Sequence, residues 1–201
     1  MDIYSIEDVK NNEELKELVV VKNRDINVDN NYWFEDILED WKEQLRDYGF
    51  SEPEIRFSGF CMQGDGASFT SQAVYLDLYL DALGHELYSD RQIKLFLDLI
   101  RNYDVVEFGV ERRDKHYVHE YTTKVWYDDY LYQFNRCPRL QQFLTKFIED
   151  LRTHMQDKIE ELNRKIYKDL DTAYAYLTSD SKVMETLEAN DYEFTEDGGI
   201  Y

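Results

Sequence analysis

The sequence has few of the residues that divide a chain into linkers and flexible loops. It contains only 2 Pro and 8 Gly in 201 residues, which leaves little room for an interdomain linker. A chain of this length can enclose one sizeable hydrophobic core. The sequence therefore predicts a single acidic domain over residues 1–201.

Cysteine and histidine are also scarce. Cys61 and Cys137 are the only cysteines and form no C-x-x-C motif, so neither a disulfide framework nor a cysteine zinc site is expected. Among the 4 His, His116 and His119 are three residues apart, a spacing that places them on opposite faces of a strand. No G-x-S-x-G motif is present. We predict no catalytic residue, no bound metal and no cofactor.

Long apolar segments are missing as well. No apolar run approaches the roughly 20 residues needed to cross a bilayer. The first eight residues are acidic and lack the basic and apolar regions of a signal peptide. These absences predict a soluble cytoplasmic protein with no membrane association.

Basic residues are outnumbered almost two to one. Lys and Arg total 23 against 43 Asp and Glu, which gives a net charge of −20. Such a field repels the backbones of nucleic acids and anionic lipids. It favours solubility, divalent cations or a basic protein as partner, and direct nucleic-acid binding is not expected.

The apolar pattern predicts an α+β fold, in which a small antiparallel sheet of about four to five strands packs with several helices. Strands are expected where β-branched and aromatic residues gather: 54–60, 67–70, 105–112 and 116–127, the last two turning at 113–115. Helices are expected where apolar residues recur every three or four positions: 5–20, 32–49, 71–83, 89–100, 138–177 and a short one after 180.

The longest of these patterns begins at Pro138. Leucines and other apolar residues step by three or four as far as Leu177, which indicates one helix of roughly ten turns or two helices with a bend. We interpret the stripe as the main core helix lying across the sheet. The alternative is that part of it packs on a second copy, which would make the protein a homodimer.

Acidic residues gather in two places. In the helix after Asn30 five acids fall within about 100° of the helical wheel, opposite an apolar arc: Asp36, Glu39, Asp40, Glu43 and Asp47. Residues 169–201 hold nine acids and one Lys, a net of −8. From this segment we select five candidate contact residues: Glu188, Asp191, Glu193, Glu196 and Asp197.

The Gly64-Asp65-Gly66 segment predicts a tight turn between two strands. It lacks the Lys and the spacing of a phosphate loop, and no carboxylates follow it at EF-hand intervals. Gln63 and Asp65 are added to the candidate contact residues. A metal-dependent hydrolase around Asp65, His116 and His119 is kept as a distant alternative.

Two stretches carry a resemblance to a known family. One runs from Phe57 through Cys61-Met62-Gln63-Gly64-Asp65-Gly66 to Phe69, and the other from Tyr176 to Gly198. They resemble a family of phage- and plasmid-borne proteins commonly labelled "antitoxin of toxin–antitoxin stability system". The resemblance implies a mobile-element origin, a bacterial host cell, and neutralisation of a toxin or defence protein.

Charge and resemblance lead to one main hypothesis. The chain would be a non-enzymatic, phage-encoded inhibitor that offers carboxylates to the basic, nucleic-acid-binding site of a defence nuclease, restriction enzyme or toxin, as a DNA mimic does. The alternative is an antitoxin that covers a toxin through hydrophobic contacts, without nucleic-acid mimicry.

Overall fold

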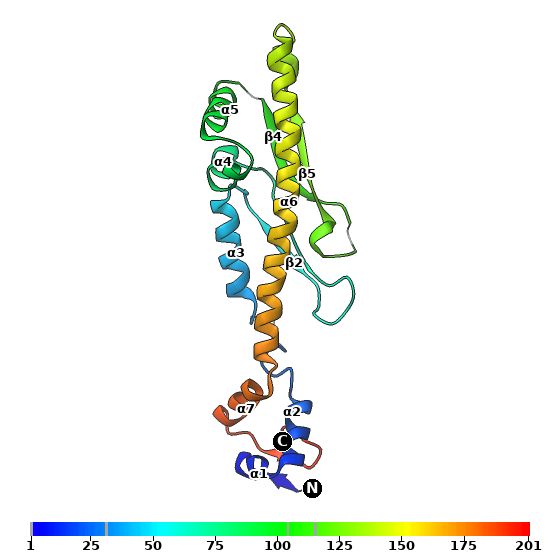
Figure 1. Cartoon of the computed structure of the whole chain (residues 1–201). Coiled ribbons are helices and arrows are strands. Elements are labelled where there is room, and N and C mark those ends of the chain that lie inside the picture. The colour runs from blue at the N-terminus through cyan, green and yellow to red at the C-terminus, as the bar shows by residue number, and fades with distance from the viewer. Residues whose placement is uncertain (1, 31, 104, 115) are drawn as a thin grey trace. The chain divides into compact units, whose positions relative to one another are not determined.

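Helices and short antiparallel strand pairs make up the chain (Figure 1). The computed structural model describes residues 2–30, 32–103, 105–114 and 116–201, and the predicted α+β class is confirmed. The helices are α1 (Ile6–Asn11), α2 (Glu13–Lys22), α3 (Glu35–Asp47), α4 (Leu76–Leu83), α5 (Asp90–Asn102), α6 (Pro138–Leu177) and α7 (Asp180–Ala189). The strands are β1 (Ile3–Tyr4), β2 (Glu54–Phe57), β3 (Ala67–Thr70), β4 (Val106–Arg112), β5 (Thr123–Asp129) and β6 (Phe194–Thr195). Three short 3-10 helices are η1 (Gly84–Glu86), η2 (Glu120–Thr122) and η3 (Leu131–Phe134).

Packing divides the chain into two compact units. The terminal unit consists of residues 1–37 and 169–201, and the central unit consists of residues 38–168. Helices α3 and α6 have residues in both. A single domain over 1–201 stays a prediction, because two compact units can still unfold in one cooperative transition. None of the helices in the described part of the chain is long and apolar enough to cross a bilayer.

The strands do not form the single sheet of four or five strands that the sequence predicts. They form three two-stranded antiparallel ladders, β1–β6, β2–β3 and β4–β5. In the central unit the second and third ladders meet at one isolated bridge between Ser71 and Val110. Elsewhere, backbone groups at the edges of these ladders bond to side chains of α6.

Two amide side chains of α6 make these contacts. Asn163, fully buried, accepts a hydrogen bond from the backbone N–H of Phe69 in β3 (3.0 Å). Gln156 accepts from the N–H of Val125 in β5 (3.0 Å) and donates to the carbonyl of Thr123 (3.2 Å). The two residues are seven positions apart and therefore face the same side of the helix. One helix face thus satisfies backbone groups of two strands.

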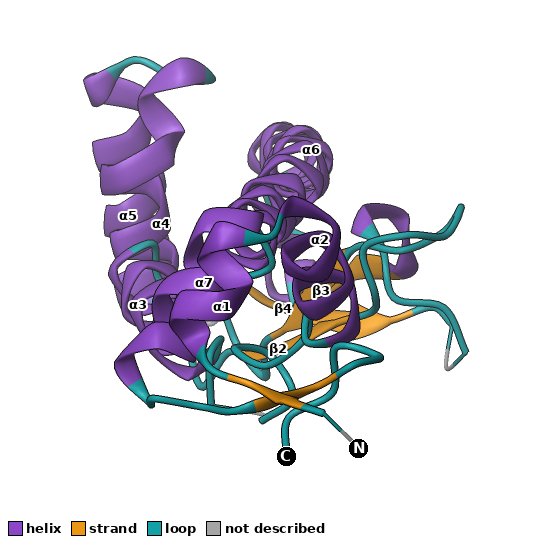
Figure 2. Ribbon diagram, turned by 90° about the horizontal axis from the view of Figure 1, so that it is seen from below, coloured by secondary structure: helices purple, strands orange, loops and turns teal. Residues whose placement is uncertain are grey.

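The apolar stripe of α6 is a core element, as the sequence predicts. Its side chains are buried from Leu144 to Leu170. Near its N-terminal end Phe147 stacks on Phe96 of α5 and on Tyr88, with ring centroids 3.9 and 4.2 Å apart. Figures 1 and 2 show α4 and α5 on one flank of α6 and the β4–β5 ladder beside it. Since its own chain covers the stripe, those side chains are not available for pairing with a second copy.

Several predicted boundaries shift for local reasons. The expected helix over 5–20 is two helices, because the Asn12 side chain accepts from the N–H of Leu15 and starts α2 anew. The helix expected over 32–49, with Asn30 as its N-cap, begins only at Glu35. Asn30 accepts from the N–H of Tyr32 in a local turn, and Asn31 lies outside the described residues. Gly49, at φ +90°, ends that helix as predicted.

The predicted hairpin over 105–127 is shorter than expected. Strand β5 begins at Thr123, because His119 caps a 3-10 turn in which its Nδ1 accepts from the N–H of Tyr121 (3.2 Å). The predicted turn at 113–115 includes Lys115, which lies outside the described residues.

The buried amide of Asn163 gives a first prediction. Asn163→Ala removes the acceptor of the Phe69 N–H and is expected to lower the free energy of unfolding by about 2–3 kcal/mol. Gln142→Ala, on the exposed face of the same helix, is the control and should change it by less than about 0.5 kcal/mol. Urea denaturation measures both, and equal effects of the two substitutions would contradict this account.

Two glycines with positive φ give a second prediction. A Cβ on Gly49 would lie 2.5 Å from the carbonyl oxygen of Tyr75, whereas a Cβ on Gly64, at φ +101°, would meet nothing within 4 Å. Gly64→Ala should therefore cost only the left-handed backbone penalty, about 1–2 kcal/mol. Gly49→Ala should cost about 1–3 kcal/mol more from the overlap. Thermal unfolding of the two variants measures the difference, and a Gly64 variant as unstable as the Gly49 variant would refute the argument.

Candidate functional site

The terminal unit joins the two ends of the chain around a small apolar core. Strand β1 pairs with β6, with Ile3 opposite Thr195 and Tyr4 opposite Phe194. The core beneath consists of buried residues from both ends: Ile6, Val9, Leu15, Val19, Val183, Leu187 and Phe194. The C-terminal segment, expected from sequence to be an acidic tail, is thus a folded part of this unit.

Ion pairs also link the two ends. Lys10 pairs with Glu188, Lys22 with Asp197 (3.1 Å) and Arg24 with Asp180 (2.9 Å). A hydrogen bond from the Thr195 hydroxyl, together with Lys22, lowers the pKa of Asp197 to about 2. The pKa of Lys10 is raised by its hydrogen bond with Glu188. Two of the predicted contact residues, Glu188 and Asp197, are therefore engaged within the fold.

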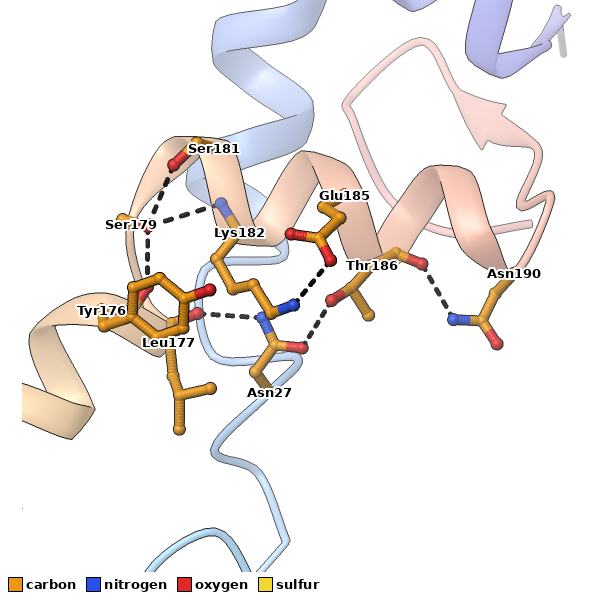
Figure 3. A network of polar contacts seen from close by, with 9 residues as sticks. All are labelled: Asn27, Tyr176, Leu177, Ser179, Ser181, Lys182, Glu185, Thr186 and Asn190. Atoms are coloured by element: carbon orange, nitrogen blue, oxygen red, sulfur yellow. Dashed lines mark hydrogen bonds and ion pairs between the residues drawn. The ribbon is translucent and has the colours of Figure 1, made fainter.

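Neutral hydrogen bonds strengthen the junction between α6 and α7. Asn27 donates to the carbonyl of Leu177 (2.9 Å) and accepts from the hydroxyl of Thr186 (2.8 Å), as Figure 3 shows. Ser179 begins α7 by accepting from the N–H of Lys182. The loop after α2 is thus fixed to both helices of the C-terminal segment.

The terminal unit carries most of the net negative charge of the chain. Its 70 residues, 37 from one end and 33 from the other, contain five bases and nineteen acids, a net charge of −14. The central unit contains eighteen bases and twenty-four acids, a net of −6. All five bases of the terminal unit, including Lys16 and Lys182, are already paired with its own carboxylates. The remaining acids cannot be neutralised by bases of their own unit.

Several of these surplus acids are exposed. Asp191, Glu193 and Glu196, predicted from the sequence, are exposed and take part in no ion pair within the described ranges. Asp191 follows α7 with φ +52°, a left-handed conformation that Asp tolerates better than most residues. On α2, Glu14 and Glu17 are equally exposed. Sequence reasoning did not select these two, although residues 1–37 hold ten acids and four bases.

The five acids of α3, predicted as one contact surface, differ in their unit and in their ion pairing. Asp36 belongs to the terminal unit, whereas the other four belong to the central unit. Glu39 pairs with Lys42 (3.0 Å) and Arg46 (3.3 Å), and its hydrogen bond with Lys42 lowers its pKa. The remaining members of the face are exposed and form no ion pair with any described residue: Asp36, Asp40, Glu43 and Asp47.

The tight turn predicted at Gly64-Asp65-Gly66 is instead part of a nine-residue loop, 58–66, because the strand expected over 54–60 ends at Phe57. The Asp65 carboxylate accepts from the N–H groups of Cys61 (3.0 Å) and Met62 (2.7 Å) and so holds the loop in shape. Phe60 stacks on Tyr167 of α6, whose hydroxyl donates to the carbonyl of Gly59 (3.1 Å). Asp65 has a structural role here, while Gln63 is exposed at the surface of the loop.

The residues of the alternative metal site are exposed or engaged in other hydrogen bonds. Asp65 is engaged by its own loop, His116 is exposed, and Nδ1 of His119 accepts from a backbone N–H. Across the described ranges no three His, Cys, Asp or Glu side chains are placed to hold one metal ion.

A buried polar cluster lies in the central unit. His154 of α6 shares a hydrogen bond of 2.9 Å with the hydroxyl of Tyr79, which is fully buried. Its Nε2 has no hydrogen-bond partner among the described residues and lies 3.8 Å from Glu86. Glu86 is held by Lys158 (2.9 Å). Burial lowers the pKa of His154 below 6.5 and raises that of Tyr79.

The chain belongs to the family described as a domain of unknown function, DUF8835, which it matches over residues 33–180. No curated protein and no solved structure matches it. The family region contains the whole central unit. The segments outside the match, residues 1–32 and 181–201, both belong to the terminal unit.

The lowered pKa of His154 gives a third prediction. In the unfolded chain this imidazole takes up a proton at higher pH than in the folded protein, so its contribution to stability is present above about pH 6.5 and is lost as the pH falls. Glu86 and Asp157 favour the proton and Lys158 opposes it, with burial the largest effect. Between pH 7 and pH 5, His154→Gln should lose less stability than the wild type in urea denaturation. Parallel pH profiles of the two proteins would show that His154 is not the titrating group.

Proposed function

We propose that this chain is a non-enzymatic inhibitor that binds a basic protein through surplus carboxylates. The observation that carries the proposal is the net charge of −14 on the 70 residues of the terminal unit, whose five bases are all internally paired. An uncompensated field of this size steers cationic proteins and repels nucleic acids. The contact surface would include Asp191, Glu193 and Glu196, with the exposed acids of α3 as a second surface.

The partner best suited to this surface is a protein that normally binds nucleic acid. Rows of carboxylates in its cationic groove release the bound anions, as a phosphate backbone would release them. The resemblance to phage- and plasmid-borne antitoxins favours a defence nuclease, a restriction enzyme or a toxin in the cytoplasm of a bacterial host. The function would then be neutralisation of that protein by occupying its binding site.

The alternative of a hydrophobic antitoxin has less support. The largest apolar surface that the sequence offered for it, the stripe of α6, is buried from Leu144 to Leu170. The 58–66 loop remains available to that hypothesis, since Met62 and Gln63 are exposed. The two hypotheses differ in the response of binding to salt, because only the electrostatic complex weakens steeply as ionic strength rises.

Affinity capture from a defence-bearing bacterium gives a fourth prediction. The wild-type chain is expected to retain a nucleic-acid-binding protein that is eluted both by salt and by excess duplex DNA. The triple variant Asp191→Asn, Glu193→Gln, Glu196→Gln should weaken that complex by at least about tenfold at low salt, because it removes three charges from the contact surface. Asp191→Asn keeps a residue that tolerates the left-handed backbone.

The matched control neutralises three exposed acids of the central unit, Asp77, Asp81 and Asp98, and should leave the complex nearly unchanged. A separate variant of Asp40, Glu43 and Asp47 tests the α3 surface. Capture that resists both salt and DNA would reject nucleic-acid mimicry and favour the hydrophobic antitoxin.

A further inference from the structure

Helix α2 carries an apolar surface within the most acidic part of the molecule. Leu18 and Val21 are 50% and 61% exposed. They are three positions apart and therefore share one face of the helix, together with the exposed acids Glu14 and Glu17. The opposite face, with Leu15 and Val19, is buried in the core of the terminal unit. The exposed pair is thus not needed to hold the helix in place.

A hollow adjoins this face. It has a volume of about 280 Å³ and is lined by Val20 and Val21, by the carboxylates of Glu13, Glu17 and Asp180, and by Lys16, which is paired with Glu13 (3.4 Å). Arg24 also lines it, and its guanidinium is fixed by Asp180 (2.9 Å) and by the carbonyl of Thr178 (2.9 Å). The hollow is smaller than the roughly 300–1,000 Å³ of small-molecule sites. Its size suits a single inserted side chain.

Charge decides which occupant fits. A second copy would bring two units of net charge −14 together, and an anionic membrane surface would be repelled in the same way. A helix with lysines or arginines beside apolar anchors at i, i+3 or i+4 complements both the valine-lined hollow and the carboxylates around it. Its cations would meet Glu14 and Glu17, which form no ion pair with any described residue.

We infer that the outer face of α2, formed by Glu14, Glu17, Leu18 and Val21 with the adjoining hollow, is the docking site for a basic amphipathic helix of the partner protein. The inference rests on the proposed function and specifies its partner: a cationic helix that contributes an apolar anchor, in addition to charge. Electrostatic attraction brings the partner to the terminal unit, and burial of Leu18 and Val21 selects among cationic partners.

The test uses two synthetic peptides of equal charge with the full-length protein. One is a helix of about 14 residues made of leucine and lysine with leucines at i, i+3, i+4 and i+7. The other has glutamine in place of every leucine. Fluorescence anisotropy at fixed salt is expected to show at least about tenfold tighter binding of the leucine peptide to the wild-type protein.

Substitution of the apolar pair gives the fifth prediction. In the double variant Leu18→Ser, Val21→Ser the preference for the leucine peptide should fall to about twofold or less, while affinity for the glutamine peptide stays unchanged. The conservative variant Leu18→Met, Val21→Ile should keep the preference. The control Leu78→Ser, Leu95→Ser changes two similarly exposed residues of the central unit and should also keep it. Circular dichroism checks that all variants are folded.

The outcomes separate this inference from the proposed function. If both peptides bind but the preference survives in the Leu18 and Val21 double variant, the docking site on α2 is refuted and the acidic binding function stands. If neither peptide binds the wild-type protein even at low salt, both proposals are contradicted. Loss of preference in the control variant as well would also refute the site.

Discussion

The terminal unit depends on holding together two chain ends that repel each other. Residues 1–37 carry a net charge of −6 and residues 169–201 a net charge of −8, so bringing them together is electrostatically unfavourable. The apolar core around Val19 and Phe194 and the short β1–β6 ladder provide the attraction. Lys10, Lys22 and Arg24 each pair with an acid of the other end. These pairs use the N-terminal bases to hold the fold together, and they leave the exposed acids without a counter-charge from their own unit.

In the central unit a different constraint decides the architecture. A two-stranded ladder has two free edges, and its backbone groups need partners when they are buried. Asn163 and Gln156 supply such partners from one face of α6. The helix therefore acts as the neighbour that a third strand would otherwise be. The strands 54–57, 67–70, 106–112 and 123–129 form two pairs joined at the bridge between Ser71 and Val110.

The sequence was sufficient to predict the features that depend on periodicity. The stripe from Pro138 to Leu177 gave one helix, because apolar spacing reports directly which face is buried. This spacing could not reveal that Asn163 is buried. A polar residue within the buried face interrupts the apolar spacing in the same way as a polar residue at the edge of that face. Nor could it show that the acids of 169–201 fold against those of 1–37, because that contact depends on the tertiary pairing of Tyr4 with Phe194. Charge composition located the acidic segments, but it could not distinguish Glu188 and Asp197, which are ion-paired, from Glu193 and Glu196, which are not.

The family match and the proposed binding surfaces cover largely different parts of the chain. The family match covers residues 33–180 and includes the β2–β3 and β4–β5 ladders, the buried His154 cluster and the whole of α6. The acids and the apolar pair to which we assign binding lie largely in residues 1–32 and 181–201. In this proposal the central unit is a scaffold whose stability depends on buried amides and apolar packing, whereas the terminal unit determines the partner. Substitutions on the exposed faces of α2 and after α7 should then change binding with little effect on the core, because the side chains involved are exposed and make few internal contacts.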